Sequence, residues 1–196
     1  MVSDHYLLTK VYKETASRTM LAVSNSSKNS YVERMDAKIE NSNSRSYIED
    51  DDVLIIQLST NDFSKGISLG NIEDEDVKDS EFFDKTTITG AIEYICARAR
   101  ELNPDIKIVF ISCPIVNSWA YRTKYKTYNE WIMQDLIQIW DINYLDLLNY
   151  EPAASSYVSL DASSLKGFFY DEIHPNFVGY SVLIYPLLVD LLTNIL

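Results

Sequence analysis

Asp171 and His174 lie three residues apart near the C-terminal end of the chain, and His174 is one of only two histidines. A neutral imidazole can take the proton of an attacking hydroxyl group. A carboxylate close to it can orient the ring and stabilise the imidazolium that forms. Because the spacing is short, this contact does not depend on long-range folding. The pair is therefore a candidate acid–base unit for acyl transfer.

A second group of polar residues follows an apolar run. Residues 53–58, Val-Leu-Ile-Ile-Gln-Leu, predict a buried strand, and Ser59-Thr60-Asn61-Asp62 comes directly after it. A side-chain amide at the C-terminal end of a strand is well placed to donate hydrogen bonds to a developing oxyanion. Asn61 is therefore a candidate for stabilising the transition state of an acyl transfer.

The elements that must position these residues alternate between two periodicities. Short β-type runs are separated by segments with helical spacing, which is the pattern of a parallel sheet with crossover helices, an α/β architecture. We expect strands over 19–23, 53–58, 106–112 and 142–147, and helices over 88–102, over 125–139 and from 176 to the C-terminus. In an open parallel sheet, chemistry collects beyond the carboxyl ends of the strands, where the candidate residues are expected.

Side-chain spacing also predicts which helix faces turn inward. In the last helix we expect Val182, Tyr185, Leu188 and Leu192 to face the core, with a bend or break at Pro186 because proline disrupts an unbroken helix. The aromatic residues around the second helix are expected to pack rather than to line a substrate groove; they are Trp119, Tyr121, Tyr125, Tyr128 and Trp131.

Composition excludes several classes of function. The chain has 196 residues, 46% of them hydrophobic, which suits a single domain over residues 1–196. Its formal charge of −12 and the absence of a clustered basic patch disfavour a nucleic-acid partner. Cys96 and Cys113 are too few for a disulfide framework and lack the spacing of a metal site, so both are expected to be buried and structural.

Neither end of the chain has the pattern of a targeting or spanning segment. The first residues lack a basic region followed by an apolar stretch, which predicts a cytoplasmic protein. Residues 183–192 are very apolar, but they are fewer than the ~20 that a spanning helix needs and they include Asp190. We therefore expect a core helix and no membrane span. The acidic stretch 73–79 is expected to be a solvated loop without a metal.

These residues together resemble the SGNH hydrolases, also called the GDSL-like lipase/acylhydrolase family, over nearly the whole chain. Asp171 and His174 match the D-x-x-H block of that family, and Asn61-Asp62 matches the N-D pair of another block. The resemblance implies a three-layer α/β/α sandwich with a parallel, flavodoxin-like sheet. It also implies that Asp171 and His174 are the triad acid and base and that Asn61 is an oxyanion-hole donor.

Two blocks depart from the pattern of the family. Asn25, within 21–27, stands where the family usually has glycine, and its backbone N–H could serve as the second oxyanion donor. No Gly-Asp-Ser occurs in the chain, which begins at a segment, 4–14, that resembles the helix following that block. We therefore expect the nucleophile block and the first strand of the sheet to be missing, as in a shortened version of a longer protein.

The nucleophile is not identifiable from these motifs. Ser24 or Ser26 would be a degenerate nucleophile loop, but too few residues separate them from the strand at Val53 to hold the intervening elements of the family. Ser3 has no room for a preceding strand. The hypothesis is a serine esterase without a cofactor, acting on a small acyl or acetyl ester, with carbohydrate esters among the candidate substrates. The alternatives are an inactive protein that binds an acylated ligand or a protein partner, and a truncated product.

Overall fold

The computed structural model describes residues 31–40, 53–57, 60–113, 120–149, 168–170 and 174–196. Its sheet contains β1 (Val53–Ile56), β2 (Lys107–Ile111) and β3 (Ile142–Leu145) in the order β1-β2-β3. Both strand pairs are parallel, with Ile55 opposite Val109 and Val109 opposite Asn143. Parallel neighbours need crossover connections, and helices provide them here.

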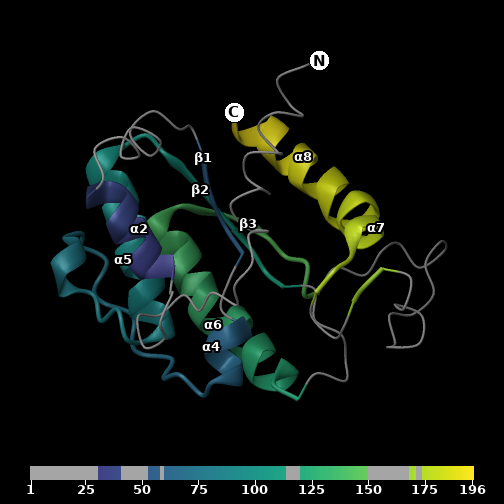
Figure 1. Ribbon diagram of the computed structural model, residues 1–196. Coiled ribbons are helices and arrows are strands. Elements are labelled where there is room, and N and C mark those ends of the chain that lie inside the picture. Colours follow the sequence, from purple (N-terminus) through teal and green to yellow (C-terminus); the bar gives the residue numbers. More distant parts are fainter. Residues whose placement is uncertain (1–30, 41–52, 58–59, 114–119, 150–167, 171–173) are drawn as a thin grey trace.

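Helices cover both faces of this sheet (Figure 1). α2 (Tyr31–Glu40), α5 (Ile88–Leu102) and α6 (Arg122–Trp140) form one layer. The continuous C-terminal helix forms the other; it consists of α7 (Phe177–Gly179), the π-helical η3 (Tyr180–Ile184) and α8 (Tyr185–Ile195). The short helices α4 (Thr60–Ser64) and η1 (Ser80–Phe82) lie in the connections. The described part of the chain is therefore a three-layer α/β/α sandwich, as the resemblance to the SGNH hydrolases implies.

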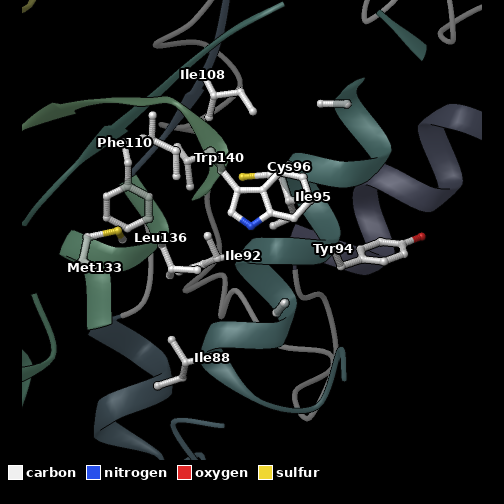
Figure 2. Packing of buried hydrophobic residues seen from close by; sticks show 14 of the residues in the cluster. Ile88, Ile92, Tyr94, Ile95, Cys96, Ile108, Phe110, Met133, Leu136 and Trp140 are labelled. Atoms are coloured by element: carbon white, nitrogen blue, oxygen red, sulfur yellow. The ribbon is translucent and has the colours of Figure 1, made fainter. Parts of the chain in front are cut away.

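Alternation along the strands divides the core into two clusters. Ile108 and Phe110 point toward α5 and α6, where they meet the buried Trp140 and Leu136 (Figure 2). Ile56 belongs to the same cluster. The neighbouring strand residues Ile55, Val109 and Ile111 point the opposite way, toward the C-terminal helix. Successive side chains of a strand face opposite sides, so continuously apolar strands require cover on both faces.

Local signals define α5. The Thr87 side chain accepts a hydrogen bond from the Gly90 N–H, an N-cap interaction, and the helix ends at Asn103 just before Pro104. A Cβ at Gly90 would lie 2.5 Å from the Asp84 carbonyl oxygen, so this close approach requires glycine. At the other end, Arg100 donates to the Trp140 carbonyl at 2.6 Å and joins the C-terminal ends of α5 and α6.

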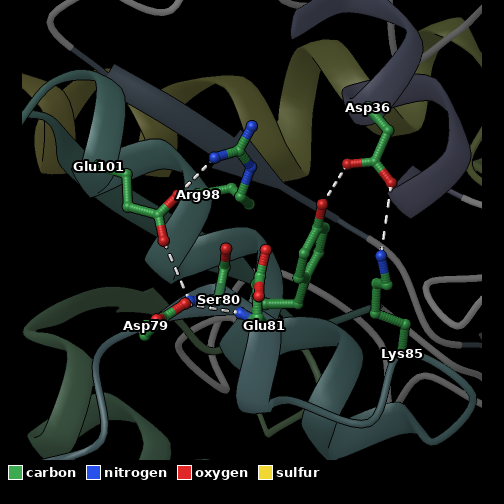
Figure 3. Close-up of polar contacts among 8 residues, drawn as sticks. Asp36, Asp79, Ser80, Glu81, Lys85, Arg98 and Glu101 are labelled. Atoms are coloured by element: carbon green, nitrogen blue, oxygen red, sulfur yellow. Dashed lines mark hydrogen bonds and ion pairs between the residues drawn. The ribbon is translucent and has the colours of Figure 1, made fainter. Parts of the chain in front are cut away.

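Polar contacts join α2 and η1 to α5 (Figure 3). The Tyr94 hydroxyl donates to Asp36 of α2, and the Lys85 ammonium lies 3.8 Å from the same carboxylate. The Glu101 carboxylate accepts from Arg98 and from the Ser80 backbone N–H. A hollow of about 550 Å³ between these elements is lined by both acids and bases, including Asp36, Lys85 and Arg98. Asp36 pairs with Lys85 across this hollow, and Arg98 pairs with Glu101 beside it, so these contacts tie α2 and the segment before α5 to α5.

The sequence-based elements agree with most of the observed ones. The predicted strands over 53–58, 106–112 and 142–147 are present as β1, β2 and β3, and the predicted helix over 88–102 has those same ends. The second helix begins earlier than predicted, at Arg122. The predicted strand 19–23 and helix 4–14 lie outside the described residues, as does Trp119. Both cysteines are buried, as predicted.

The aromatic residues of α6 divide into two groups. Tyr125 and Tyr128 are buried, which confirms the packing interpretation for them. That interpretation is wrong for Trp131, which is 71% exposed, and for Tyr121, which is 40% exposed. The helix covers the sheet with one face only, so aromatic residues on its outer face remain in solvent.

The inward face of the C-terminal helix differs from the prediction. Leu188 and Leu192 are buried as expected, but Val182 and Tyr185 are 41% and 37% exposed, and Ile184 faces the core instead. The cause is the π turn, in which the Tyr185 N–H donates to the Tyr180 carbonyl and the regular helical spacing is lost. The expected interruption of the helix near Pro186 is this π turn. Pro186 itself lies in the first turn of α8, where its missing N–H costs little.

This helix also bears on the expected absence of a membrane span. Phe177–Ile195 has 19 residues and a mean hydropathy of 1.5, which is long and apolar enough to cross a bilayer, and 22% of it is buried. Core helices of soluble proteins meet the same test of length and composition, so this is weak evidence for a span. One row of its side chains belongs to the core, and much of the remaining surface is exposed.

Glu93 is a buried carboxyl group in the layer formed by α5 and α6. It is 1% exposed, its Oε1 accepts from the Glu73 N–H at 3.4 Å, and its Oε2 has no hydrogen-bond partner among the described residues. Burial raises the pKa of Glu93 from 4.5 to about 7. The Glu73 N–H, the nearby Trp140 indole and the charge of Lys78 lower the pKa, whereas the charge of Glu73 raises it further. The native state therefore favours the protonated form.

We expect Glu93→Gln to reduce the pH dependence of stability. Since the pKa is raised on folding, the wild-type protein loses stability as pH rises from about 4.5 through 7, and the loss is then constant. Each pKa unit corresponds to ~1.4 kcal/mol, so the full effect is on the order of 3 kcal/mol. Denaturant unfolding between pH 5 and 8 measures it.

Glu101→Gln is the matched control on the same helix. The pKa of Glu101 is lowered, because hydrogen bonds from Ser80 and Arg98 outweigh the effect of burial. Glu101 is therefore ionised in both states over this pH range, and Glu101→Gln should keep the wild-type slope. An unchanged slope in Glu93→Gln would show that Glu93 titrates normally in the native state.

Candidate functional site

Polar residues follow all three strands where each strand ends. Thr60 and Asn61 come after β1, Ser112 and Cys113 follow β2, and Asp146 follows β3. The strands are parallel, so their carboxyl ends meet at one edge of the sheet. This edge is the candidate active site.

Asn61 is held in place by the helix in which it lies. It is half-buried in the first turn of α4, and its carbonyl accepts from the Lys65 N–H at 3.0 Å. Phe63, 1% exposed, anchors that helix edge-on against Tyr125 and Tyr128 of α6, with ring centroids 5.2 and 5.5 Å apart. Such aromatic contacts favour one orientation of α4, and with it one position for the Asn61 amide.

Tyr125 and Cys113 connect this helix to the central strand. The buried Tyr125 hydroxyl accepts from the Cys113 N–H at 3.0 Å. Burial raises the pKa of the Cys113 thiol to about 11, and interactions with Tyr125 and Thr60 moderate the rise. A thiol with a raised pKa is a poor nucleophile, so Cys113 is a packing residue that joins the ends of β1 and β2.

Ser112 has a structural role at the same edge. Its hydroxyl donates to the Asp146 carboxylate at 3.2 Å and accepts from the backbone N–H groups of Leu147 and Leu148 at 2.8 and 2.9 Å. The residue is fully buried. The hydroxyl thus fixes the path of the chain after β3 and is not available as a nucleophile.

His174 lies at the start of the C-terminal helix in a short antiparallel turn. Phe169 and Pro175 form a β-bridge, and the Tyr170 N–H donates to the His174 carbonyl at 2.8 Å. The Asn176 side chain then caps α7 by accepting from the Gly179 N–H at 3.0 Å. The side chain of His174 is exposed. These contacts fix its backbone at the start of the helix.

Gly179 allows this turn to lie close to the helix. A Cβ on Gly179 would be 2.1 Å from the Phe168 carbonyl oxygen, far inside van der Waals contact. Tyr180 follows and packs against the cluster that includes Ile111 at the end of β2. Burial raises the pKa of Tyr180, with a further contribution from Cys113. The Asn61 and His174 segments therefore both approach the end of β2, through Thr60 and Tyr180 respectively.

The remaining candidates lie outside the described residues. They are the proposed triad acid Asp171, the second oxyanion donor Asn25, and the weak nucleophile candidates Ser24, Ser26 and Ser3. The roles of these residues, and those of His174 and Asn61, stay predictions. Sequence reasoning missed the contact of Tyr125 with Cys113 and that of Ser112 with Asp146. The available signal was a polar residue directly after each apolar strand.

A family model described as the GDSL-like lipase/acylhydrolase family matches residues 5–182. The chain belongs to this family. The match spans both Asn61 and His174, and it confirms the resemblance inferred from the motifs. Membership of the GDSL-like lipase/acylhydrolase family suggests an ester hydrolase.

Solved structures support the same fold. A crystal structure of a protein from Lactobacillus plantarum has a TM-score of 0.62 at 17% identity, covering 90% of this chain and 78% of that chain. A possible lipase from Chitinophaga pinensis has a TM-score of 0.53 at 20% identity, with 73% and 72% covered. At these identities the likeness concerns the fold alone. The comparison with curated proteins found no match.

We expect Gly179→Ala to displace the His174 turn. The new methyl group would collide with the Phe168 carbonyl, and overpacking of this kind costs about 1–3 kcal/mol. Denaturant unfolding measures this loss. NMR should show a changed imidazole resonance for His174, assigned against a His5→Ala sample.

Ser181→Ala is the control for that substitution, because Ser181 is exposed two residues further along the same helix. It should change the free energy of unfolding by less than about 0.5 kcal/mol and leave the resonance in place. A Gly179→Ala protein with native stability and an unshifted His174 signal would contradict the close approach.

Proposed function

We propose that this protein is a serine ester hydrolase acting on small acyl or acetyl esters, carbohydrate esters among them. The observation that carries the proposal is the family match over residues 5–182, which includes both Asn61 and His174. Their positions support it: Asn61 follows β1 at the carboxyl edge, and the exposed His174 precedes the helix that packs on the end of β2.

In the proposed mechanism His174 takes the proton of a serine hydroxyl as that oxygen attacks the ester carbonyl, and returns the proton to the leaving alcohol. Asp171 orients the ring and stabilises its charged form. The Asn61 amide and a backbone N–H at Asn25 hold the oxyanion. Water then hydrolyses the acyl-enzyme. These steps need no cofactor. The nucleophilic serine is not identified in this chain, and its weak candidates, Ser24 and Ser26, lie outside the described residues.

His174→Ala should reduce kcat for a short soluble ester such as p-nitrophenyl acetate by about 100- to 10,000-fold, because general acid–base catalysis contributes an effect of that size. His5→Ala is the matched control, since it removes the only other histidine and should leave kcat unchanged. Circular dichroism verifies that both variants are folded. Undiminished turnover in His174→Ala would remove the triad assignment.

The absence of Gly-Asp-Ser from the sequence favours a second candidate, a protein that binds an acylated ligand without hydrolysing it. Incubation with a fluorophosphonate, followed by intact-mass measurement, separates the two. A covalent adduct on a serine, lost in His174→Ala, supports the hydrolase, because the reagent traps activated serine nucleophiles. An unmodified chain that still binds an acylated ligand supports the binding protein.

A further inference from the structure

The outer surface of the C-terminal helix changes character along its length. Its first turns expose Phe177 (81%), Val178 (46%), Val182 (41%) and Tyr185 (37%). Its later turns expose Asp190, Thr193 and Asn194 instead. Apart from Leu196 at the last position, the large hydrophobic side chains that this helix exposes lie at the end that follows His174.

Tyr170 extends this surface beyond the helix. It is 78% exposed, and its backbone N–H bonds the His174 carbonyl, which holds the two residues in the same turn. We call the five side chains the C-terminal apolar patch: Tyr170, Phe177, Val178, Val182 and Tyr185. The exposed imidazole of His174 lies between two of its members in the chain. Clustered exposed apolar residues of this kind mark interaction sites.

The charge around the patch limits the kind of partner. No Asp, Glu, Lys or Arg occurs between His174 and Asp190, and the acids Asp171 and Glu172 precede the histidine. The chain as a whole carries a formal charge of −12. An anionic surface would be repelled, and no side chain in this stretch could form an ion pair with a charged partner. An uncharged, apolar partner fits.

The size of the patch separates a lipid surface from a second protein chain. Stable protein–protein interfaces use about 20–30 residues on each side, many more than the five of the patch. Peripheral attachment to lipid needs only one apolar helix face, and tyrosine is favoured at the boundary between lipid and water. The helix is also apolar enough by composition, with a mean hydropathy of 1.5 and 22% of it buried.

From these observations we propose that the C-terminal apolar patch docks the protein on an electrically neutral lipid–water interface and thereby presents interfacial esters to His174. The inference deepens the proposed function and rests on it for the role of His174. Docking itself does not require catalysis. The patch would seat the start of the helix in the headgroup region, with Asp190 and the later turns remaining in water.

Co-sedimentation with phosphatidylcholine vesicles tests the docking. The wild-type chain should bind, and Phe177→Ser with Val182→Ser should lower the vesicle-binding constant about tenfold, since ~1.4 kcal/mol of lost apolar contact corresponds to that factor. Leu196→Ser, which removes a side chain 66% exposed at the far end of the same helix, is the matched control and should bind normally. Vesicles rich in phosphatidylglycerol should bind less well than neutral ones.

A milder pair, Val178→Thr with Val182→Thr, guards against misfolding of the serine variant, and thermal unfolding checks both. Absence of binding by the wild-type chain, or equal binding by the folded variants, would overturn the proposal. So would a wild-type dimer in sedimentation that the variants abolish, because the patch would then face a second copy. Strong destabilisation of both variants without lipid would show that the chain itself covers the patch, and would also overturn it.

A soluble ester separates this inference from the proposed function. The patch variants should hydrolyse p-nitrophenyl acetate at the wild-type rate and should lose rate on an ester dispersed in neutral vesicles. If the wild-type protein binds vesicles but hydrolyses neither ester, docking stands and the proposed hydrolase fails. If it hydrolyses the soluble ester without binding vesicles, the hydrolase stands and docking fails.

Discussion

Burial of a parallel sheet on both faces is the constraint on which this structure depends. Each strand is apolar at consecutive positions, so Ile55 and Ile56 must enter different cores. The layer of α2, α5 and α6 covers one of them, and the C-terminal helix contributes the row of Ile184, Leu188 and Leu192 to the other. Because crossover connections keep the strands parallel, their carboxyl ends are brought to a single edge, where the polar residues gather.

At that edge, packing determines how the polar groups are presented. The Asn61 amide depends on α4, which depends on Phe63 seated against Tyr125 and Tyr128. The Tyr125 hydroxyl in turn accepts a hydrogen bond from the Cys113 N–H, which fixes the position of α6 relative to the end of β2. Ser112, a hydroxyl at a strand end, proves to be fully used in fixing the chain after β3. Its burial and its hydrogen-bond partners therefore assign Ser112 a structural role, although the family consists of serine hydrolases.

The C-terminal helix combines two roles that have opposite requirements. Its buried row stabilises the second core, while its first turns support the turn that carries His174 and expose apolar side chains. The π turn allows one helix to fulfil both roles. It accommodates Pro186 and shifts the register, so that Ile184 enters the core and Val182 and Tyr185 do not. Helices with such bulges are often found at functional sites, and here the bulge follows the candidate base by six residues.

Several features could be predicted from the sequence alone because they are set by local order. The alternation of apolar runs with helical spacing predicts the α/β architecture, and side-chain spacing predicts the extent of α5. Short motifs identify Asn61 and His174 as site candidates, and their roles stay predictions. Other features required the tertiary structure. The register of the last helix, the occupied hydroxyl of Ser112, the raised pKa of Glu93 and the exposed patch beside His174 all depend on which distant side chains meet. Sequence spacing cannot specify them, since burial is a property of the packed layers and not of any one segment.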